Sequence, residues 1–513
     1  MGTFTTGDGL TGDLHFDVCI IGSGAGGAIV AHELTKAGFK VVVLEEGGHF
    51  THKDFKMRED QAFPNLYQES GSRTTKDLGV SILQGRAVGG TTVVNWTTSF
   101  RTPEPVLDHW KKKHAIGGFA VADLNPHWDT VEQRLSIAQI DIIEANRNNR
   151  TLYDGCKALG LEVATLRRNV KNCLKSGYCG LGCPVDAKQS MLVTYLPDAV
   201  AAGATVVSHC RVDKLVIEAG RVTSAQCSLI GDDNYNATGK ALTIRAERFV
   251  LSAGAIGSPT VLMRSGLGGG LVGRRTFLHP VIGSSARWAE PINPFYGAPQ
   301  SVASHAFAHR GEGKVGLFLE AAPLQPMLAA LATTGFGEAH AHAMAELANT
   351  SAHIALAIDG FTDGETGGTV EVRESGAPIL DYPLPPVVWE ALKEGLRQLI
   401  KIDLAAGAKE VFSSHDPMLS FKSEKDLAQL DNAPFETGRV AIFSAHVMGG
   451  CKMGDDAASS VVRSTDLRHH AIANLHVVDG SVFPTSLGVN PQLSIYGLSH
   501  LMSSRFVGEW KHG

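Results

Sequence analysis

The first fifty residues alternate short apolar runs with glycine-rich turns. Residues 16–21 (FDVCII) form a short apolar run, rich in β-branched residues and followed by glycine, which predicts a buried strand. Apolar residues at helical spacing follow and stop at Gly38, and residues 40–44 (KVVVL) predict a second strand. This order of strand, loop, helix and strand is typical of a dinucleotide-binding βαβ unit.

The loop between the first strand and the helix reads GSGAGG, from Gly22 to Gly27. We expect Gly22 to permit the sharp turn, Gly24 to let the backbone approach a pyrophosphate, and Gly27 to let the helix pack closely on the strand. Glu45 follows about twenty residues later, where an acidic side chain can bind ribose hydroxyls. The pattern predicts an ADP-containing cofactor, with a purely structural turn as the alternative. The loop alone does not distinguish a nicotinamide from a flavin dinucleotide.

Later in the chain, the apolar pattern predicts a second layer of strands and helices. Residues 351–358, 368–372 and 378–382 are strand-like, and a helix with one apolar face then runs toward Gly407. That face is formed by Val388, Leu392, Leu396 and Leu399. Strands followed by a helix favour an antiparallel sheet with helices on one side.

A final helix is predicted near the C-terminus. Its apolar stripe at helical spacing consists of Ile495, Leu498, Met502 and Phe506. Just before the stripe, Asn490 and Pro491 suit the N-cap and the first helical position.

Composition and charge exclude several classes of protein. With 43% hydrophobic and 19% charged residues among 513, the chain can bury enough apolar surface to fold as a globular protein. Its 46 Lys and Arg against 52 Asp and Glu give a net charge of -6, which argues against nucleic-acid partners. The chain shows neither an apolar stretch long enough to span a membrane nor a secretory signal. Eight cysteines without a disulfide framework favour a soluble protein of the reducing cytoplasm; the oligomeric state is left open.

Three further parts of the chain resemble signature regions of the glucose-methanol-choline (GMC) family of FAD-dependent oxidoreductases. They are residues 85–95 (GRAVGGTTVVN), residues 254–266 (GAIGSPTVLMRSG), and a C-terminal region with HVMGGCKMG from His446 and VVDGSVFPTSLGVNPQLSIYGLSH from Val477. The resemblance covers both ends and the middle of the chain, and it implies FAD as the cofactor.

The resemblance also implies the fold class, which is α/β (α+β). A Rossmann-like FAD-binding domain is expected to be assembled from discontinuous segments, namely residues 1–105, 195–285 and 440–513. Residues 106–194 and 286–439 are expected to form a substrate-binding domain and lid, with an antiparallel sheet that is flanked by helices and covers the flavin.

Residues 85–95 carry four candidate cofactor residues. Gly89 and Gly90 let the main chain pass close to a flat ring, and Thr92 and Asn95 can form hydrogen bonds with flavin or pyrophosphate. The alternative is a glycine-rich hairpin without a ligand.

Other cofactor contacts are expected in the middle and at the end of the chain. Residues 249–252 predict a strand that leads to Gly254, and Ser258 with Pro259 predicts the start of a helix, although a packing corner is the alternative. The resemblance implies that the backbone at Val212 contacts the adenine. It also implies that two residues meet the ribityl chain and pyrophosphate, and these are Asp479 and Gly480.

Two residues are candidates for catalysis. Hydride leaves an alkoxide far more readily than an alcohol, so a base must remove the hydroxyl proton, and histidine is the usual choice. His446 corresponds to the catalytic histidine of the family, and Asn490 stands where the family has His or Asn, so it can orient the substrate oxygen. Asn490 can also act as a helix cap. The helix start at Pro491 is expected to face the flavin and stabilise negative charge there.

The closest resemblance within the family is to the long-chain (fatty) alcohol oxidases, while the GVNP ending also looks like cholesterol oxidase. This implies oxidation of a hydrophobic primary alcohol, long-chain or aromatic, to the aldehyde, with reoxidation by O2 to give hydrogen peroxide, or by another acceptor. The alternatives are a sterol or secondary-alcohol oxidase, a lyase or flavin photoenzyme of fatty acid decarboxylase type on the same fold, and a flavin-binding protein without turnover.

Four other features are considered for a role in the site. Cysteines separated by five and three residues could bind an iron-sulfur cluster, but a fourth thiolate is missing nearby, so no metal site is predicted. His340 and His342 lack a metal-binding context, and Glu320 is either an active-site acid or a structural residue. The three cysteines concerned are Cys173, Cys179 and Cys183. The apolar residues 315–344 suit a substrate channel, a lid or ordinary core.

Overall fold

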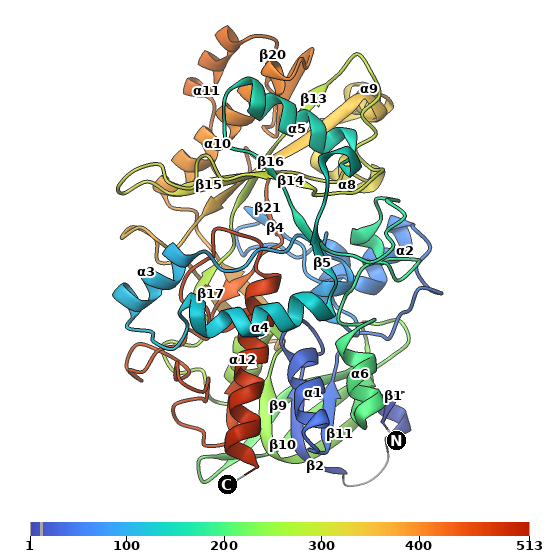
Figure 1. The fold of residues 1–513 in the computed structure, drawn as a ribbon, viewed down its shortest axis with the longest axis vertical. Helices are drawn as coiled ribbons and strands as arrows, with labels where there is room; N and C mark the ends of the chain where they lie inside the picture. The colour runs from blue at the N-terminus through green and yellow to red at the C-terminus, as the bar shows by residue number, and fades with distance from the viewer. Residues whose placement is uncertain (1, 11–13, 512–513) are drawn as a thin grey trace.

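Two large sheets lie one above the other along the long axis of the molecule (Figure 1). They belong to a computed structural model that describes residues 2–10 and 14–511. An eight-stranded sheet lies in the lower half of the view and a nine-stranded sheet in the upper half. The mixed α/β class expected from the sequence is confirmed.

The lower sheet contains the predicted βαβ unit. Strands β2 and β3 pair in parallel, with Val18 opposite Val41, and α1 connects them. Parallel pairing continues from β3 to β8 and from β2 to β11, and β9 and β10 add an antiparallel hairpin. The strands, in sheet order, are β1 Thr3–Thr6, β8 Thr205–Ser208, β3 Val41–Leu44, β2 Leu14–Ile21, β11 Ala237–Leu251, β10 Arg221–Ile230 and β9 Cys210–Glu218, with β23 Leu475–Val477 beside β11.

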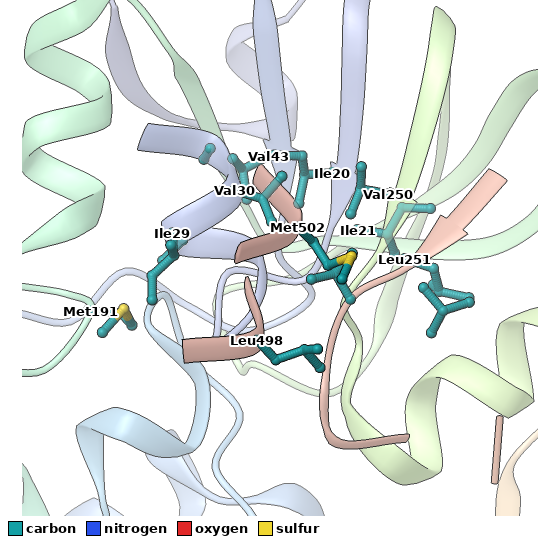
Figure 2. Packing of buried hydrophobic residues seen from close by; sticks show 14 of the residues in the cluster. Ile20, Ile21, Ile29, Val30, Val43, Met191, Val250, Leu251, Leu498 and Met502 are labelled. Atoms are coloured by element: carbon teal, nitrogen blue, oxygen red, sulfur yellow. The ribbon is translucent and has the colours of Figure 1, made fainter. Parts of the chain in front are cut away.

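Apolar side chains between this sheet and its helices form the main core (Figure 2). Ile20, Val43 and Val250 come from three neighbouring strands, Ile29 comes from α1, and Met502 comes from α12, and all five are fully buried. Helices α1 and α12 also contact each other. This packing holds the carboxyl ends of β2 and β3 in place, which is where open α/β sheets bind their ligands. The helices of this half are α1 Gly27–Lys36, α4 Val121–Arg134, α6 Tyr195–Ala202, α7 Gly254–Arg264 and α12 Gln492–Trp510.

The upper sheet is mainly antiparallel and carries α5 and α10, so the predicted antiparallel sheet with helices is present. Its strands, in order, are β20 Ser420–Phe421, β19 Glu410–Ser413, β13 Val281–Arg287, β16 Thr350–Ile358, β15 Gly316–Ala321, β14 Val302–Ser304 and β6 Ala164–Thr165, with β21 Ile442–Ser444 beside β13 and β4 Val80–Ile82 beside β21. The helices of the upper half and the rim are α2 Glu59–Leu66, α3 Glu104–His114, α5 Arg147–Ala158, α8 Pro326–Ala332, α9 Gly337–Ala345, α10 Pro386–Ala405 and α11 Gln429–Asn432.

The three strands expected at residues 351–358, 368–372 and 378–382 are present, but the second and third lie in a different sheet from the first. β17 and β18 pair with β12 and β22 in a four-stranded sheet that contacts α7, instead of joining β16. Their bounds are β18 Pro378–Asp381, β17 Gly368–Val372, β12 Arg274–Phe277 and β22 Met448–Gly449, and a small pair consists of β5 Ile137–Gln139 and β7 Arg167–Asn169. The apolar pattern did not predict the partner strands β12 and β22, because both are too short to show an alternation of apolar and polar residues.

Segments expected in the cofactor domain contribute to the upper sheet as well. β4 and β21 come from the predicted ranges 1–105 and 440–513, yet they pair beside β13. The two-part division of the chain remains a prediction, and the two halves share strands at their junction.

Two helix starts differ from the sequence prediction. Helix α7 begins at Gly254, four residues before Ser258, because the strand β11 turns directly into it. Helix α12 begins at Gln492 with Pro491 as its N-cap, so Asn490 is not the cap. The reason is that the Asn490 side chain is engaged elsewhere, with His446 and Glu320.

Candidate active site

A cavity of about 730 Å³ opens at the carboxyl ends of the lower strands. Its volume is in the range of cofactor and ligand pockets. The predicted residues that line it are Gly22, Gly24, Glu45, Gly90, Thr92, Asn95, Val212, Gly254, His446, Asp479, Gly480, Asn490 and Pro491. Segments from both chain ends and from the middle therefore meet at one cavity, and two predicted residues, Gly27 and Gly89, do not line it.

The three glycines of the first loop differ in what surrounds them. Gly22 has φ of +99°, in the left-handed region that favours glycine. A Cβ on Gly27 would lie 2.0 Å from the Gly22 carbonyl oxygen, so this position is closed by the packing of α1 on the loop. A Cβ on Gly24 would meet only Gly90, at 3.7 Å, and would point toward open cavity. Gly22 thus makes the turn, Gly24 leaves the backbone open to a ligand, and Gly27 allows close helix packing, as the motif predicts.

Glu45 lies at the end of β3 and is anchored to the glycine loop. Its carboxylate accepts hydrogen bonds from Ser23 N (3.1 Å), Ser23 Oγ (2.6 Å) and Gly47 N (3.0 Å). Burial raises the pKa of Glu45 despite these donors. Oε2 accepts both bonds from Ser23, whereas Oε1 accepts only the bond from Gly47 and has a second lone pair that can still accept a ribose hydroxyl at the cavity wall. Ser23, which the sequence analysis did not single out, also accepts a bond from Gly89 N (2.9 Å) and so joins the two glycine segments.

The second glycine segment lies directly against the first. Gly90 has φ of +57°, and a Cβ there would be 2.8 Å from the Gly24 Cα. Thr92 uses its hydroxyl internally, donating to the Gly89 carbonyl (2.6 Å) and accepting from Met191 N (3.0 Å). Thr92 therefore shapes the loop, and any contact with a cofactor comes from its remaining surface at the cavity.

Asn95 and its neighbour Trp96 leave polar atoms open at the same wall. Asn95 Nδ2 donates to Gln492 Oε1 at 2.7 Å. Asn95 Oδ1 and Trp96 Nε1 are buried, and within the described part of the chain they have no hydrogen-bond partner. Buried polar atoms are almost always paired, so these two indicate a missing ligand.

Asp479 joins the start of α7 to its own C-terminal segment at the cavity. Its carboxylate accepts from Gly254 N (2.8 Å), Ser258 Oγ (2.6 Å) and Ser481 N (2.8 Å). Burial raises its pKa in spite of those bonds. Gly480 and the Val212 stretch of β9 line the cavity nearby.

These observations fit a dinucleotide such as FAD. The bare Gly24 backbone, the Glu45 carboxylate and the unpaired atoms of Asn95 and Trp96 offer the contacts that a pyrophosphate, a ribose and a polar ring edge require. Polar residues of the wall that were not singled out from the sequence include Ser23, Glu46, Arg86, Trp96, Gln300 and Gln492. Three of them, Ser23, Arg86 and Gln492, lie inside the glycine loop or the signature segments, so the sequence offered a signal for these.

His446 and Asn490 are brought together as predicted. Asn490 Nδ2 lies 3.2 Å from His446 Nε2, and both side chains line the cavity. Asn490 Nδ2 also lies 3.4 Å from Glu320 Oε2, which accepts in addition from Gln300 Nε2 at 3.2 Å. Glu320 Oε1 and Asn490 Oδ1 lack partners among the residues described. The three side chains form a polar cluster that leaves two acceptor atoms free.

Burial shifts the two titratable members of this cluster in opposite directions. It lowers the pKa of His446 to about 4, because the imidazolium cannot be hydrated there. It raises the pKa of Glu320 to about 8, because the carboxylate loses its hydration. Such perturbed neighbours in a cavity are typical of catalytic sites.

A fourth side chain, His279, contacts this cluster and was not found from the sequence. Its Nδ1 lies 3.2 Å from His446 Nδ1, and its Nε2 accepts a hydrogen bond from Gly488 N at 3.0 Å. It comes from a segment far away in the chain, between β12 and β13, so no local pattern points to it.

The three cysteines of the loop, His340 and His342 are not among the residues that line the cavity. Cys173, Cys179 and Cys183 are free thiols, and among the described residues no group of three or more metal-ligating side chains is positioned to hold a metal ion. His340 contacts the Ala330 carbonyl at 3.0 Å on the outer helices. Within residues 2–10 and 14–511, no helix combines the length and apolar character needed to cross a membrane.

Comparison with protein-family models gives three matches. A GMC oxidoreductase N-terminal model matches residues 63–281, and a GMC oxidoreductase C-terminal model matches residues 365–499. An NAD(P)-binding Rossmann-like domain model matches residues 20–63. The matched regions include the glycine loop, both signature segments, His446 and Asn490.

Curated relatives extend over nearly the whole chain. A long-chain-alcohol oxidase of Arabidopsis thaliana is 30% identical over 96% of this chain and 68% of its own. An uncharacterized GMC-type oxidoreductase of Sinorhizobium fredii is 30% identical over 95% of this chain and 93% of its own.

Solved structures share the fold. Pyridoxine 4-oxidase from Mesorbium loti aligns with a TM-score of 0.70 at 18% identity, covering 96% of this chain and 99% of that chain. A formate oxidase variant from Aspergillus oryzae aligns with a TM-score of 0.73 at 16% identity, covering 98% of this chain and 100% of that chain.

Proposed function

The chain belongs to the GMC oxidoreductase family, and from that premise we propose that it oxidises the CH-OH group of a hydrophobic primary alcohol, long-chain or aromatic, to the aldehyde with FAD as cofactor. The observation that carries the proposal is the placement of His446 and Asn490 on the wall of a cavity whose glycine loops and open polar atoms suit FAD. FAD, when bound there, supplies the acceptor for the hydride of the alcohol carbon.

Similarity to long-chain-alcohol oxidases supports the hydrophobic substrate. A sterol or other secondary alcohol is the next candidate. A lyase or flavin photoenzyme on the same fold is disfavoured, because both members of the His446 and Asn490 pair are present and in contact.

The cluster of His446, Asn490 and Glu320 offers different groups for binding the substrate hydroxyl and for removing its proton. We propose that His446 and Asn490 bind the substrate oxygen and that a group of the cluster takes its proton. His446, the base expected from the sequence, is uncharged at neutral pH because burial holds its pKa near 4. Glu320 is a second candidate, since its Oε1 lacks a partner within the described chain and burial raises its pKa to about 8.

The electron acceptor and the compartment are also proposals. We propose O2 as the acceptor that regenerates the oxidised cofactor, giving hydrogen peroxide, with another acceptor as the alternative. A reducing compartment such as the cytoplasm is supported by the eight cysteines, all described and all free.

An anaerobic reduction experiment tests the function. The purified FAD-loaded protein is mixed without oxygen with primary alcohols of increasing chain length, aromatic alcohols and sterols, and the flavin absorbance is followed. We expect bleaching that is fastest with a hydrophobic primary alcohol. His446→Ala should slow bleaching by about 10² or more while FAD stays bound, because it removes a group that contacts the reacting oxygen.

A matched control uses His309→Ala, since His309 is exposed at the surface. This variant should bleach at the wild-type rate. Unchanged colour with every alcohol would contradict the proposed oxidation, and loss of FAD from His446→Ala would show that His446 holds the cofactor instead of acting on the substrate.

A further inference from the structure

The backbone register places His279 opposite His446. In one sheet Phe277 pairs with Met448, and in the next Val281 pairs with Phe443, both in antiparallel register. The residues midway between these pairs are therefore brought face to face where the two sheets join. Ser444 ties the segments together, because its hydroxyl accepts from His446 N (3.1 Å) and donates to the Leu278 carbonyl.

The backbone at His279 is held in an unusual conformation. Its φ is +46°, which is uncommon for a residue other than glycine. The buried Asp359 carboxylate accepts from both Leu278 N and His279 N at 3.0 Å, and it also accepts from the Tyr382 hydroxyl. A strained, over-determined residue of this kind at a site indicates a functional constraint.

The hydrogen bonds of His279 determine where its proton lies. A backbone N–H can only donate, so the bond from Gly488 N makes His279 Nε2 an acceptor. Burial and the neighbouring His446 lower the pKa of His279, so the ring is neutral and carries its one proton on Nδ1. That proton points at His446 Nδ1, 3.2 Å away. His446 Nδ1 is therefore an acceptor, and neutral His446 must carry its own proton on Nε2.

We infer that His279 is a positioning residue that locks His446 in the tautomer with its proton on Nε2, so that His446 donates a hydrogen bond to the substrate oxygen. This inference rests on the proposed function and specifies how its central residue acts. The direction of the bond is set by Gly488, whose amide belongs to the main chain and cannot reverse its polarity.

The proton on His446 Nε2 also determines the orientation of the Asn490 amide. As drawn, Asn490 Nδ2 faces His446 Nε2, and both would be donors. The oxygen and nitrogen of an amide exchange places by a half turn, an assignment made from the hydrogen-bond network. After that turn Asn490 Oδ1 accepts from His446 Nε2. It then also faces Glu320 Oε2 in place of Nδ2, which suits the protonated form of Glu320 that burial favours before the substrate binds.

The tautomer also decides between the two candidates for the hydroxyl proton. His446 with a proton already on Nε2 cannot accept another there without becoming a buried cation. The alcohol O–H bond then breaks toward the ionised Glu320 carboxylate, a new O–H bond forms on Glu320, and the electron pair stays on the substrate oxygen. His446 stabilises that oxygen by donation as its negative charge develops.

Two isosteric substitutions separate this role from simple packing. Asn and Asp both tolerate the left-handed backbone and have the same size. His279→Asn can still donate to His446 Nδ1 through its amide, whereas the ionised carboxylate of His279→Asp can only accept, so the two variants are compared at a pH high enough to ionise it. We expect His279→Asp to draw the His446 proton onto Nδ1 and to lower kcat/KM by about 10². His279→Asn should keep the proton on Nε2 and lose less than about tenfold.

The proton position is read directly, without turnover, from two-bond nitrogen-proton NMR spectra of protein labelled with ¹⁵N-histidine and loaded with FAD. The signals of His446 are identified by their loss in His446→Gln. A wild-type spectrum with the proton on Nδ1 would overturn the inference, as would identical spectra and kcat/KM for the Asn and Asp variants. If both variants lose FAD, the wild-type spectrum alone decides.

The two proposals fail in different ways. If no alcohol reduces the wild-type cofactor, the proposed oxidation is wrong whatever the tautomer. If an alcohol reduces it but the proton lies on His446 Nδ1, the oxidation stands and His279 does not lock the tautomer.

Discussion

At the scale of single residues, burial gives two polar groups of one cluster opposite charge preferences. His446 is held neutral because protonation would create a buried cation, and Glu320 is held protonated up to about pH 8 because ionisation would create a buried anion. Neither residue type reveals this, since both have ordinary pKa values in water. The same burial turns Asn490 from an expected helix cap into a partner of both.

The pH dependence of alcohol oxidation follows from these shifts. Glu320 can take a proton only when ionised, so kcat/KM should rise with pH and level off above about pH 8. Glu320→Gln should lower kcat/KM by about 10² or more and remove the rise. The measurement is anaerobic flavin reduction at a series of pH values. A profile that is flat from neutral pH upward, falls only near pH 4 and persists in Glu320→Gln would assign the proton to His446 instead.

At the scale of elements, the glycines of the first loop have different structural roles. The sequence predicts β2, α1 and β3 within a few residues of their observed bounds, because apolar spacing and glycine are local signals. The predicted start of α12 was wrong, because the Asn490 side chain bonds to other residues instead of capping the helix. The pairing of β17 with β12 was not predicted, because β12 is too short to give an apolar pattern.

Two single-methyl substitutions test the separate tasks of the loop. Gly27→Ala should destabilise the apoprotein, because the new Cβ would lie 2.0 Å from the Gly22 carbonyl. Gly24→Ala should leave apoprotein stability nearly unchanged, since its Cβ has 3.7 Å to the nearest atom, and should weaken FAD binding because the methyl occupies the path of the cofactor. Thermal unfolding of the apoproteins and FAD titrations measure both.

The reverse pattern would contradict the assignment of these positions. If Gly24→Ala binds FAD as tightly as wild type, the cofactor does not approach the loop at that residue. If Gly27→Ala keeps wild-type stability, the helix is not packed against the loop as closely as described.

At the scale of the whole molecule, the site is a junction of distant segments. The cavity is lined by the loops after β2 and β3, by the middle of the chain at Gly254, and by the C-terminal stretch around Asn490. The two sheets share this junction through β4, β21 and β13. Hydrogen bonds from Gly89 to Ser23 and from Gly254 to Asp479 also join these segments, and a ligand in the cavity would contact all of them.

Removal of FAD should loosen both chain ends together. We expect faster amide hydrogen exchange at residues 22–27 and 479–491 in apoprotein than in FAD-loaded protein, because a ligand stabilises the state that binds it. Helix α9, whose residues are not buried, serves as the internal control and should exchange equally in both forms. Protection confined to one chain end would contradict a cofactor that bridges them.

The sequence by itself determined the family, the class of cofactor, the βαβ unit and the identity of His446 and Asn490, because motifs with fixed spacing are written in neighbouring residues. Only the tertiary structure shows the contacts and burial from which we infer how those residues act. The contacts of His279, Glu320 and Gly488 join positions hundreds of residues apart or in different sheets, and pKa values depend on the burial that such contacts create. Hydrogen-bond direction and desolvation are properties of the assembled site, so no local pattern records them.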